Sequence, residues 1–321
     1  MLKELNTKVL AGERLTKEEA VNLVKIGEDR IMKLLAGADE IKNKFNGQQV
    51  SLCSIINAKS GSCSEDCSFC AQSSHYETKA ETYPLVDKKE ILNRAQQMEA
   101  EGAHHFGLVT SGREVLSEKE FSQIIDSIVE IQTKTNLEVC ASLGTLDKKS
   151  ADALAEVGLA RYNHNLETSE SYFPKICTTH KYEERKKTVK LLKERGIEVC
   201  CGGIIGLGED LKDRIELAFT LRELGVDSVP INVLTPVEGT PLEASSLVPP
   251  LEVLKTAAIF RFILPEKTIK LCGGRESNLR NLQSLALLSG INGLLIGNYL
   301  TTSGRDAKED LQMIKDLGLS S

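Results

Sequence analysis

Short apolar runs alternate with longer amphipathic runs along most of this chain. The short runs, rich in branched aliphatic residues, predict strands at 51–57, 105–110, 137–142, 160–165, 197–203, 228–234, 268–272 and 293–297. The longer runs predict helices that begin at Asp87 and Ser117 and at about 148–157, 181–195, 210–224, 250–264, 276–289 and 306–317. Strands alternating with helices indicate parallel βαβ units, and eight units close into an α/β fold of the (β/α)8 TIM type, with its active site at the carboxyl ends of the strands.

The first 46 residues predict a helical extension that precedes the barrel. Thr16 followed by Glu19 forms a capping box, and apolar residues follow it at helical spacing. We therefore expect two parts, an N-terminal helical extension at 1–46 and a barrel at 47–321.

Three cysteines, Cys63, Cys67 and Cys70, follow the first predicted strand in a CxxxCxxC spacing. Thiolates are soft ligands for zinc, copper(I) and iron–sulfur clusters, and three on one loop can hold three corners of a four-iron cube. The fourth iron is then open to chelate an amino-acid head group, and the spacing, with Phe69 before the last cysteine, resembles that of radical S-adenosylmethionine enzymes. A zinc site is the alternative, but it normally has four ligands, and only His75 lies nearby.

Composition and charge narrow the classes of function. The net charge of −6 offers no basic footprint for nucleic acid. No apolar run approaches the ~18 residues that span a bilayer, and the first residues lack the apolar core of a signal peptide. We expect a cytoplasmic protein whose nine cysteines serve metal or redox chemistry rather than disulfides.

The stretch 202–208 is rich in glycine and follows the fifth predicted strand. Its spacing differs from the GxGxxG fingerprint of dinucleotide-binding sheets, and no such fingerprint follows the first strand. We expect its glycines to let the backbone approach a ligand, with a simple turn as the alternative.

Asparagines stand at the ends of two predicted strands. Asn163 and Asn165 share one face of the fourth strand, while His164 takes the other and is expected to pack in the core. Asn232 on the sixth strand adds a third amide. A single asparagine often has only a structural role in a turn, but three at strand ends favour a planar polar ligand such as a ureido ring or a ribose.

From about residue 45 to 317 the chain resembles the biotin synthase family of radical S-adenosylmethionine enzymes. The resemblance is carried by GSCSEDCSFC at 61–70, QSS at 72–74, YNHNLETS at 162–169, GGIIGLGE at 202–209, VPIN at 229–232 and GRE at 274–276. It implies conversion of dethiobiotin to biotin by insertion of one sulfur atom between two unactivated carbons. It also implies a four-iron cluster, S-adenosylmethionine, an auxiliary iron–sulfur cluster, a flavodoxin- or ferredoxin-type electron donor and a homodimer.

The resemblance also assigns residues to roles. The four-iron cluster that starts the reaction would be held by the loop cysteines, Cys63, Cys67 and Cys70. The ureido ring of dethiobiotin would be held by three amides, Asn163, Asn165 and Asn232. Glu167 would bind the ribose of S-adenosylmethionine and Arg185 its carboxylate, with Asn165 and Ile204 also at this cofactor. The family usually has Asp where Glu167 stands, so we expect a longer or rearranged ribose contact.

The auxiliary cluster is where the chain departs from the family. The positions that match the family's three cysteines and one arginine are Gly107, Cys140, Cys200 and Arg275. Gly107 has no side chain to offer, and Cys53 on the first strand is expected to replace it. We expect Cys53, Cys140 and Cys200 to hold a four-iron cluster whose open iron carries an extra sulfide. The alternative is a two-iron cluster with a weaker ligand.

The remaining cysteines are expected to play smaller parts. Cys272 is a possible fourth ligand but should face outward if its strand is regular, and Cys201 should face outward likewise. Cys177 lies in a predicted loop and is not expected to be a ligand.

Two other readings of the chain remain open. One is another radical enzyme of the same subfamily, such as a hydrogenase-cofactor maturase or a methylornithine synthase. The other is an electron-transfer or storage protein that only holds clusters, for which neither the barrel nor the paired amides would be needed.

Overall fold

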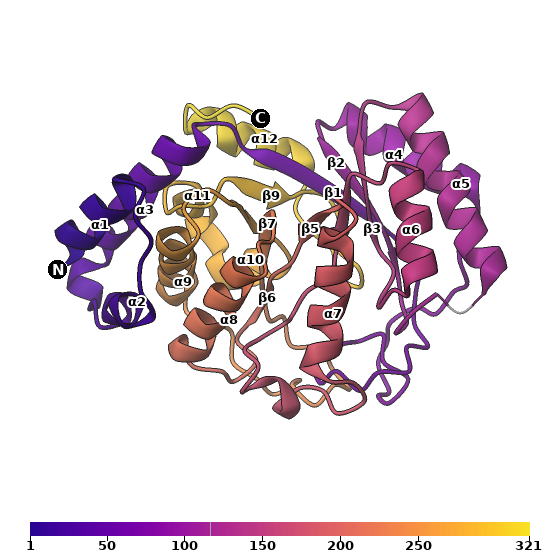
Figure 1. The fold of residues 1–321 in the computed structure, drawn as a ribbon, viewed down its shortest axis with the longest axis horizontal. Coiled ribbons are helices and arrows are strands. Elements are labelled where there is room, and N and C mark those ends of the chain that lie inside the picture. The colour runs from indigo at the N-terminus through magenta and orange to yellow at the C-terminus, as the bar shows by residue number, and fades with distance from the viewer. Residues whose placement is uncertain (116) are drawn as a thin grey trace.

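Nine labelled strands form one closed, parallel sheet in the computed structural model, which describes residues 1–115 and 117–321 (Figure 1). The strands are β1 (Ser51–Lys59), β2 (His105–Thr110), β3 (Glu138–Ser142), β4 (Arg161–Asn163), β5 (Glu198–Cys200), β6 (Gly203–Ile205), β7 (Ser228–Val233), β8 (Thr268–Leu271) and β9 (Gly293–Leu295). Their order is β5-β4-β3-β2-β1-β9-β8-β7-β6, and β5 also pairs with β7, which closes the barrel. Because β5 and β6 occupy one strand position beside β7, the layout is the predicted (β/α)8 barrel, and the fold class is confirmed.

Helices cover the outside of the barrel (Figure 1). They are α4 (Lys88–Ala100), α5 (Glu118–Lys134), α6 (Lys148–Glu156), α7 (Tyr182–Lys193), α8 (Leu211–Glu223), α9 (Pro250–Ile263), α10 (Arg275–Leu279), α11 (Gln283–Leu287) and α12 (Ala307–Asp316), with short turns η2 (Phe173–Lys175) and η3 (Arg280–Leu282). Asp87 and Ser117 cap α4 and α5 as predicted, accepting backbone hydrogen bonds at 2.8 and 3.1 Å. Within the described ranges, no helix has the length and apolar character of a membrane span.

The single helix predicted at 276–289 is wrong. The chain instead forms α10, η3 and α11. At Arg280 the backbone φ is 52°, in the left-handed region through which an α-helix cannot continue. Apolar spacing alone does not reveal a break at one residue.

The N-terminal extension consists of α1 (Leu2–Leu10), α2 (Lys17–Val24), η1 (Glu28–Arg30) and α3 (Ile31–Asn46). The predicted capping box is present, since Glu19 N–H donates to Thr16 Oγ1 at 3.2 Å and Thr16 N–H to Glu19 Oε2 at 2.8 Å. The α3 helix packs along the barrel helix α9 (Figure 1). The division at residue 46 stays a prediction, because the extension shares its apolar face with the barrel.

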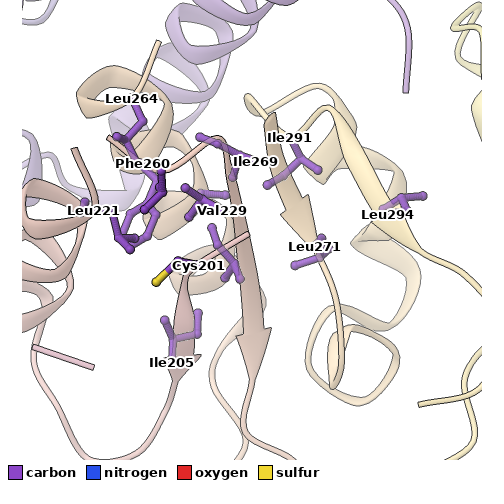
Figure 2. Packing of buried hydrophobic residues seen from close by; sticks show 14 of the residues in the cluster. Cys201, Ile205, Leu221, Val229, Phe260, Leu264, Ile269, Leu271, Ile291 and Leu294 are labelled. Atoms are coloured by element: carbon purple, nitrogen blue, oxygen red, sulfur yellow. The ribbon is translucent and has the colours of Figure 1, made fainter. Parts of the chain in front are cut away.

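Much of the apolar core lies between the strands and the surrounding helices. Figure 2 shows Cys201 in this layer, on the side of the strands where Leu221 and Phe260 lie. Cys201 therefore faces outward, as predicted.

A fully buried ion pair holds the last helix against the barrel. Arg275, the first residue of α10, donates from Nη1 to Asp310 Oδ1 of α12 at 3.0 Å, and both side chains are 0% exposed. Arg275 Nη2 also points to the carbonyl oxygen of Leu295 at 3.4 Å. Because a buried charge is tolerated only when it is paired, this contact ties α12 to the carboxyl end of β9.

We predict that Asp310→Ala lowers the free energy of unfolding by about 3–5 kcal/mol, because the guanidinium of Arg275 is left buried without its counter-charge. Chemical denaturation of the variant and parent chains measures the change. Asp316→Ala removes an exposed carboxylate from the same helix and should change stability by less than about 0.5 kcal/mol. Similar losses in the two variants would contradict this assignment.

Candidate functional site

Two neighbouring cavities open at the carboxyl ends of the strands. The outer cavity, about 260 Å³, is lined by the cysteine loop and by residues at strand ends. The inner cavity, about 290 Å³, is lined by residues farther back along the strands. Both are lined by five shared residues, Val109, Ser142, Asn163, Asn165 and Leu300. A ligand that reaches between the cavities therefore has to pass these side chains.

The thiols of Cys63, Cys67 and Cys70 all line the outer cavity. The backbone of their loop is closed on itself, since Cys63 N–H donates to Gln72 O at 3.0 Å and Cys70 N–H to Cys67 O at 2.9 Å. Burial raises the pKa of Cys70 to about 11, so its thiolate needs a nearby positive charge. Three soft donors around one space fit the three protein-bound irons of a cube.

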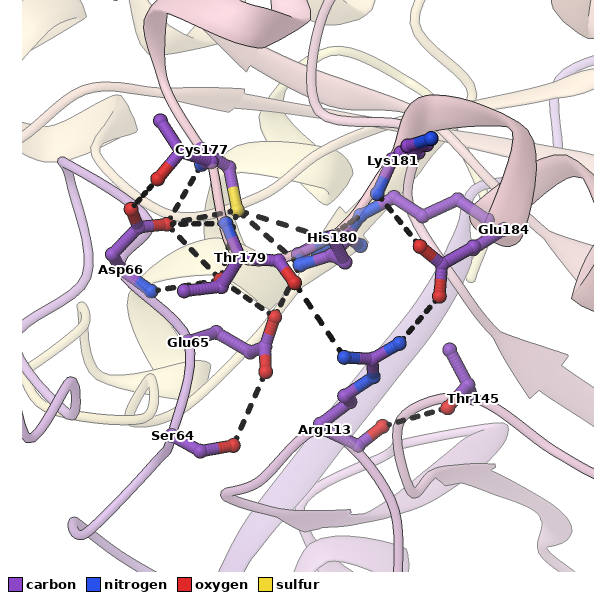
Figure 3. A network of polar contacts seen from close by, with 12 residues as sticks. Ser64, Glu65, Asp66, Arg113, Thr145, Cys177, Thr179, His180, Lys181 and Glu184 are labelled. Atoms are coloured by element: carbon purple, nitrogen blue, oxygen red, sulfur yellow. Dashed lines mark hydrogen bonds and ion pairs between the residues drawn. The ribbon is translucent and has the colours of Figure 1, made fainter.

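Asp66 ties the cysteine loop to the segment that precedes α7. Its Oδ1 accepts hydrogen bonds from the backbone N–H groups of Thr178 and Thr179 at 2.8 and 3.2 Å. Figure 3 shows this network, in which Glu65 also contacts His180. Burial raises the pKa of Asp66, but the hydrogen bonds from Thr178 outweigh this effect and hold that pKa well below its usual range. The sequence reasoning missed these anchoring residues, since only the fold brings positions 65–66 and 177–180 together.

Cys177 lies beside the cluster loop rather than in the inner cavity. Its Sγ is 3.2 Å from Asp66 Oδ1 and 3.2 Å from His180 Nδ1. Ligand atoms of Cys67, Cys177 and His180 lie within 4.8 Å of one another. The prediction that Cys177 is not an auxiliary-cluster ligand agrees with this position.

Glu167 is held in a strained backbone conformation beside the outer cavity. Its φ is 69°, which is uncommon for a residue with a side chain. Its carbonyl oxygen accepts from Ile204 N–H at 2.8 Å, and a Cβ on Gly203 would lie only 2.3 Å from that oxygen. Glycine at 203 is therefore required for the backbone of β6 to approach the backbone of Glu167. The expected approach of this stretch to a ligand stays a prediction.

The Glu167 carboxylate retains capacity to bind a ligand. Oε1 is 3.5 Å from Arg185 Nη1, whereas the buried Oε2 has no hydrogen-bond partner among the described residues. Burial raises the pKa of Glu167, and Arg185 partly offsets that effect. Arg185 Nη1 also donates to the carbonyl oxygen of Asn165 at 2.8 Å. An acceptor and a cation thus face the outer cavity together, a donor set that fits the ribose and carboxylate of S-adenosylmethionine.

The three amides differ in how far the protein already uses them. Asn163 makes no side-chain hydrogen bond within residues 1–115 and 117–321, although its side chain lines both cavities. Asn165 Oδ1 accepts from Gly202 N–H at 3.2 Å. Asn232 is engaged at both ends, with Oδ1 accepting from Gly273 N–H at 3.1 Å and Nδ2 donating to Gly203 O at 3.4 Å. Asn163 is therefore the amide with the most capacity for a guest.

His164 is buried at 6% exposure, as predicted for a core residue. It also touches the outer cavity, because β4 ends at Asn163 and the strict alternation of faces ends there too. Burial lowers the pKa of His164 well below its usual range, so the ring is neutral.

Four cysteines line the inner cavity, namely Cys53, Cys140, Cys200 and Cys272. The expectation that Cys272 faces outward is wrong. Lys270 on β8 lines the cavity, and residues two apart on a strand share a face, so Cys272 points inward with it. Burial raises the pKa of Cys140 to about 12. Gly107 lines the same cavity without a side chain, as expected.

Arg275 does not line the inner cavity, which corrects its place in the predicted ligand set. Its side chain is taken up by Asp310 at the edge of the barrel. The cation on the cavity wall is Lys270, whose Nζ lies 2.8 Å from Cys53 Sγ. Sequence reasoning missed Lys270, although its spacing of two from Cys272 on a predicted strand was the available signal.

Two family models match the chain. Residues 59–221 match the Radical SAM superfamily, and residues 230–320 match the Biotin and Thiamin Synthesis associated domain. Among curated relatives, a biotin synthase of Pelotomaculum thermopropionicum is 56% identical over 100% of this chain and 99% of its own length. A biotin synthase of Carboxydothermus hydrogenoformans is 53% identical over 98% of this chain and 97% of its own.

Solved structures with the same fold are more distant in sequence. A methylornithine synthase superposes with a TM-score of 0.85 at 22% identity, over 98% of this chain and 96% of its own. A maturase of the [FeFe]-hydrogenase superposes with a TM-score of 0.86 at 17% identity, over 99% of this chain and 74% of its own. At these identities the likeness concerns the fold alone.

The lowered pKa of Asp66 makes the free energy of unfolding depend on pH in acid. A carboxyl whose folded-state pKa is depressed stabilises the fold above its unfolded pKa, about 3.9, and loses that contribution as the pH falls through the folded value. Below pH ~4 the free energy of unfolding should therefore fall more steeply for the parent than for Asp66→Asn. Denaturation curves at a series of pH values measure the slopes. Asp126→Asn, at an exposed carboxylate of α5, should keep the parent slope, and an Asp66→Asn slope equal to the parent's would contradict the anchoring role.

Proposed function

The chain belongs to the biotin synthase family, whose reaction inserts sulfur into dethiobiotin, and we propose how its two cavities divide this work. The outer cavity would hold the four-iron cluster and S-adenosylmethionine, and the inner cavity the auxiliary cluster. Dethiobiotin would lie between them. The observation that carries this proposal is the amide pair of Asn163 and Asn165, which lines both cavities. The maturase and the methylornithine synthase share only the fold.

Cys63, Cys67 and Cys70 would ligate the four-iron cluster, which when bound supplies the electron that cleaves the carbon–sulfur bond of S-adenosylmethionine. The protein supplies position and exclusion of water. Asp66 and Glu65 keep the loop against the chain before α7.

Glu167 and Arg185 would orient S-adenosylmethionine. The partnerless Oε2 of Glu167 offers an acceptor to the ribose hydroxyls, and Arg185 offers charge-assisted donors to the carboxylate. Asn165 and Ile204 would complete the site. The carbonyl oxygen of Asn165 accepts from the Arg185 side chain, and the N–H of Ile204 donates to the backbone carbonyl of Glu167. The strain at Glu167 is consistent with a residue held for binding.

Asn163, Asn165 and Asn232 would hold the ureido ring of dethiobiotin, whose N–H and C=O groups match primary amides. The free amide of Asn163 supports a direct contact. Asn232 supports the site more through the backbone of Gly203 and Gly273, which it bridges.

Cys53, Cys140 and Cys200 would hold an auxiliary four-iron cluster, with an extra sulfide on the remaining iron as the sulfur to be transferred. These three thiols stand on alternate strands, β1, β3 and β5, and line one cavity, which supports this proposal. Cys272 lines the same cavity and is the alternative ligand of the fourth iron, where it would take the place of the extra sulfide. A two-iron cluster is the alternative.

Other parts of the proposal rest on the family. The electron donor would be a flavodoxin- or ferredoxin-type protein, and the enzyme would be a cytoplasmic homodimer. All nine cysteines are free thiols, which supports a reducing compartment.

Replacing Cys63, Cys67 and Cys70 together by Ala should abolish reductive cleavage of S-adenosylmethionine, because no other thiol set lines the outer cavity among the described residues. Chromatographic assay of 5′-deoxyadenosine, with a chemical reductant, measures it. Cys201→Ala, which removes an outward thiol, is the control and should retain cleavage. Continued formation of 5′-deoxyadenosine by the triple variant would sink the assignment.

Asn163→Ala should weaken dethiobiotin binding by about 1–3 kcal/mol, the range for a lost hydrogen bond to a buried polar group, without lowering the free energy of unfolding. Asn232→Ala should weaken binding and also stability, because its amide ties β6 to Gly273, the second residue after β8. Titration calorimetry and denaturation measure the two effects. Binding as tight as the parent's in either variant removes that residue from the substrate site.

The nuclearity of the auxiliary cluster can be read in the Cys63/Cys67/Cys70→Ala chain, where only the inner cavity can assemble one. Mössbauer spectroscopy and iron analysis should find a four-iron cluster, and a two-iron signal would refute that proposal. Adding Cys53→Ala should remove the cluster. An intact cluster there takes Cys53 out of the ligand set, and the same measurement on Cys272→Ala decides whether Cys272 is a ligand.

A further inference from the structure

Lys270 is a buried cation without a carboxylate partner. It is 3% exposed, and its only side-chain contact among the described residues is the thiol of Cys53, 2.8 Å from Nζ. A buried ammonium normally requires an opposite charge or several acceptors. A single sulfur atom is one weak acceptor and leaves the other two N–H groups of the ammonium without a partner in the part of the chain that the structure describes.

Arg161 on β4 is a second incompletely paired cation behind the same cavity. Its Nε and Nη2 donate to Glu198 Oε2 at 3.0 and 2.6 Å, but the buried Nη1 has no partner among the described residues. Arg161 lies two residues before Asn163, which lines the inner cavity, so both belong to the inward face of the strand. In the sheet register Arg161 is paired with Cys140.

Two other buried cations, Arg261 and Lys42, are well paired. Arg261, 0% exposed, donates to carbonyl oxygens that include those of Gly290 and Lys267, each at 2.8 Å, and to Asn292 Oδ1 at 2.7 Å. Lys42, 2% exposed, pairs with Asp39 at 2.7 Å and with the Leu287 carbonyl at 2.7 Å. Arg275 also has a buried Nε without a hydrogen-bond partner within the described ranges, but its guanidinium is paired with the carboxylate of Asp310. Lys270 has no such carboxylate among its hydrogen-bond and ion-pair partners in the described residues.

We propose that Arg161 and Lys270 form a binding site for an inorganic sulfur anion, sulfide or hydrosulfide, at the base of the inner cavity. The inference rests on the auxiliary cluster proposed above and identifies the residues that hold its transferable sulfide. A sulfide bound to iron is an anion that accepts hydrogen bonds, and inside a barrel few water molecules are available to donate them. Two N–H donors with positive charge stabilise it, and they offset the negative charge that thiolate ligands bring to the cavity. Lys270 acts as a hydrogen-bond donor here and not as an iron ligand.

The test uses the full chain with Cys63, Cys67 and Cys70 changed to Ala, so that the inner cavity alone assembles a cluster. The cluster is first assembled without oxygen from ferric iron, a thiol reductant and unlabelled sulfide, so that its bridging sulfides carry no label. After free sulfide is removed, the chain receives ³⁵S-labelled sulfide, and a parallel iron-free sample receives the same label. Label retained only in the sample with iron identifies sulfide bound to the cluster. Label retained in both samples identifies free hydrosulfide. Either result supports the site if the variants described below retain less label. The readouts are labelled sulfide per chain and the midpoint potential of the cluster.

Lys270→Met and Arg161→Met should each raise the sulfide concentration for half-maximal labelling by about tenfold, which corresponds to about 1.4 kcal/mol. Each should also lower the midpoint potential, because a positive charge near the added electron is lost. Lys270→Arg should keep both values near the parent's. Lys42→Met, which removes an equally buried cation outside the barrel, is the matched control and should leave both values unchanged.

Parent-like labelling and potential in both Met variants would overturn the inference and leave the cluster proposal standing. A parent chain that assembles no auxiliary cluster would overturn that proposal, and this inference with it. If Arg161→Met does not fold, Arg161→Lys replaces it, since lysine keeps the charge but lacks the second N–H edge. It should then lose labelling without lowering the potential, and parent-like labelling would count against the site.

Discussion

The site depends on the backbone of Gly202 and Gly203, which other residues can approach closely because these two positions have no side chain. Asn165 accepts a hydrogen bond from Gly202, and Asn232 donates one to Gly203. Glu167 reaches its strained conformation beside the same backbone, at an approach that any Cβ on Gly203 would prevent. This glycine segment thus positions two of the amides proposed to hold the substrate and the carboxylate proposed to bind the ribose. This is also why the strand splits into β5 and β6, since the segment between them bonds side chains at the site.

Over the described residues, the interior of this barrel lacks the layers of packed aliphatic side chains that usually fill a TIM barrel. Branched aliphatic side chains fill most TIM barrels in layers, whereas Cys53, Cys140, Cys200 and Lys270 stand at inward positions here. The apolar core between strands and helices therefore has to support the fold from outside (Figure 2). The N-terminal helices extend that core along α9. An interior built in this way is preorganised for cofactors at the cost of its own packing.

Much of the fold and part of the site follow from local sequence. The alternation of short apolar runs with longer amphipathic runs predicts the barrel, because strands and helices have very different periods of apolar residues. The cysteine loop is recognisable because its three candidate ligands are close together in the chain. The orientation of Cys272 could not be predicted in the same way, because β8 has only four residues. Cys272 lies on the inward face because it is two residues from Lys270, which lines the inner cavity. Arg275 was misplaced because its partner Asp310 is 35 positions away. Asp66 likewise contacts a segment more than a hundred residues later, and no local pattern records such a pairing.

The sharing of Asn163 and Asn165 between the cavities constrains the order of the chemistry. If the cofactors occupy the two cavities as proposed, the substrate would have to be held beside these amides, where the two cavities meet. The same amides and Leu300 line both cavities. Holding the substrate by its polar ring leaves its saturated carbons free to face either cofactor, and no acid or base need touch the reacting bonds. Positioning is therefore the main catalytic contribution of the chain itself, and the cofactors supply the reactivity.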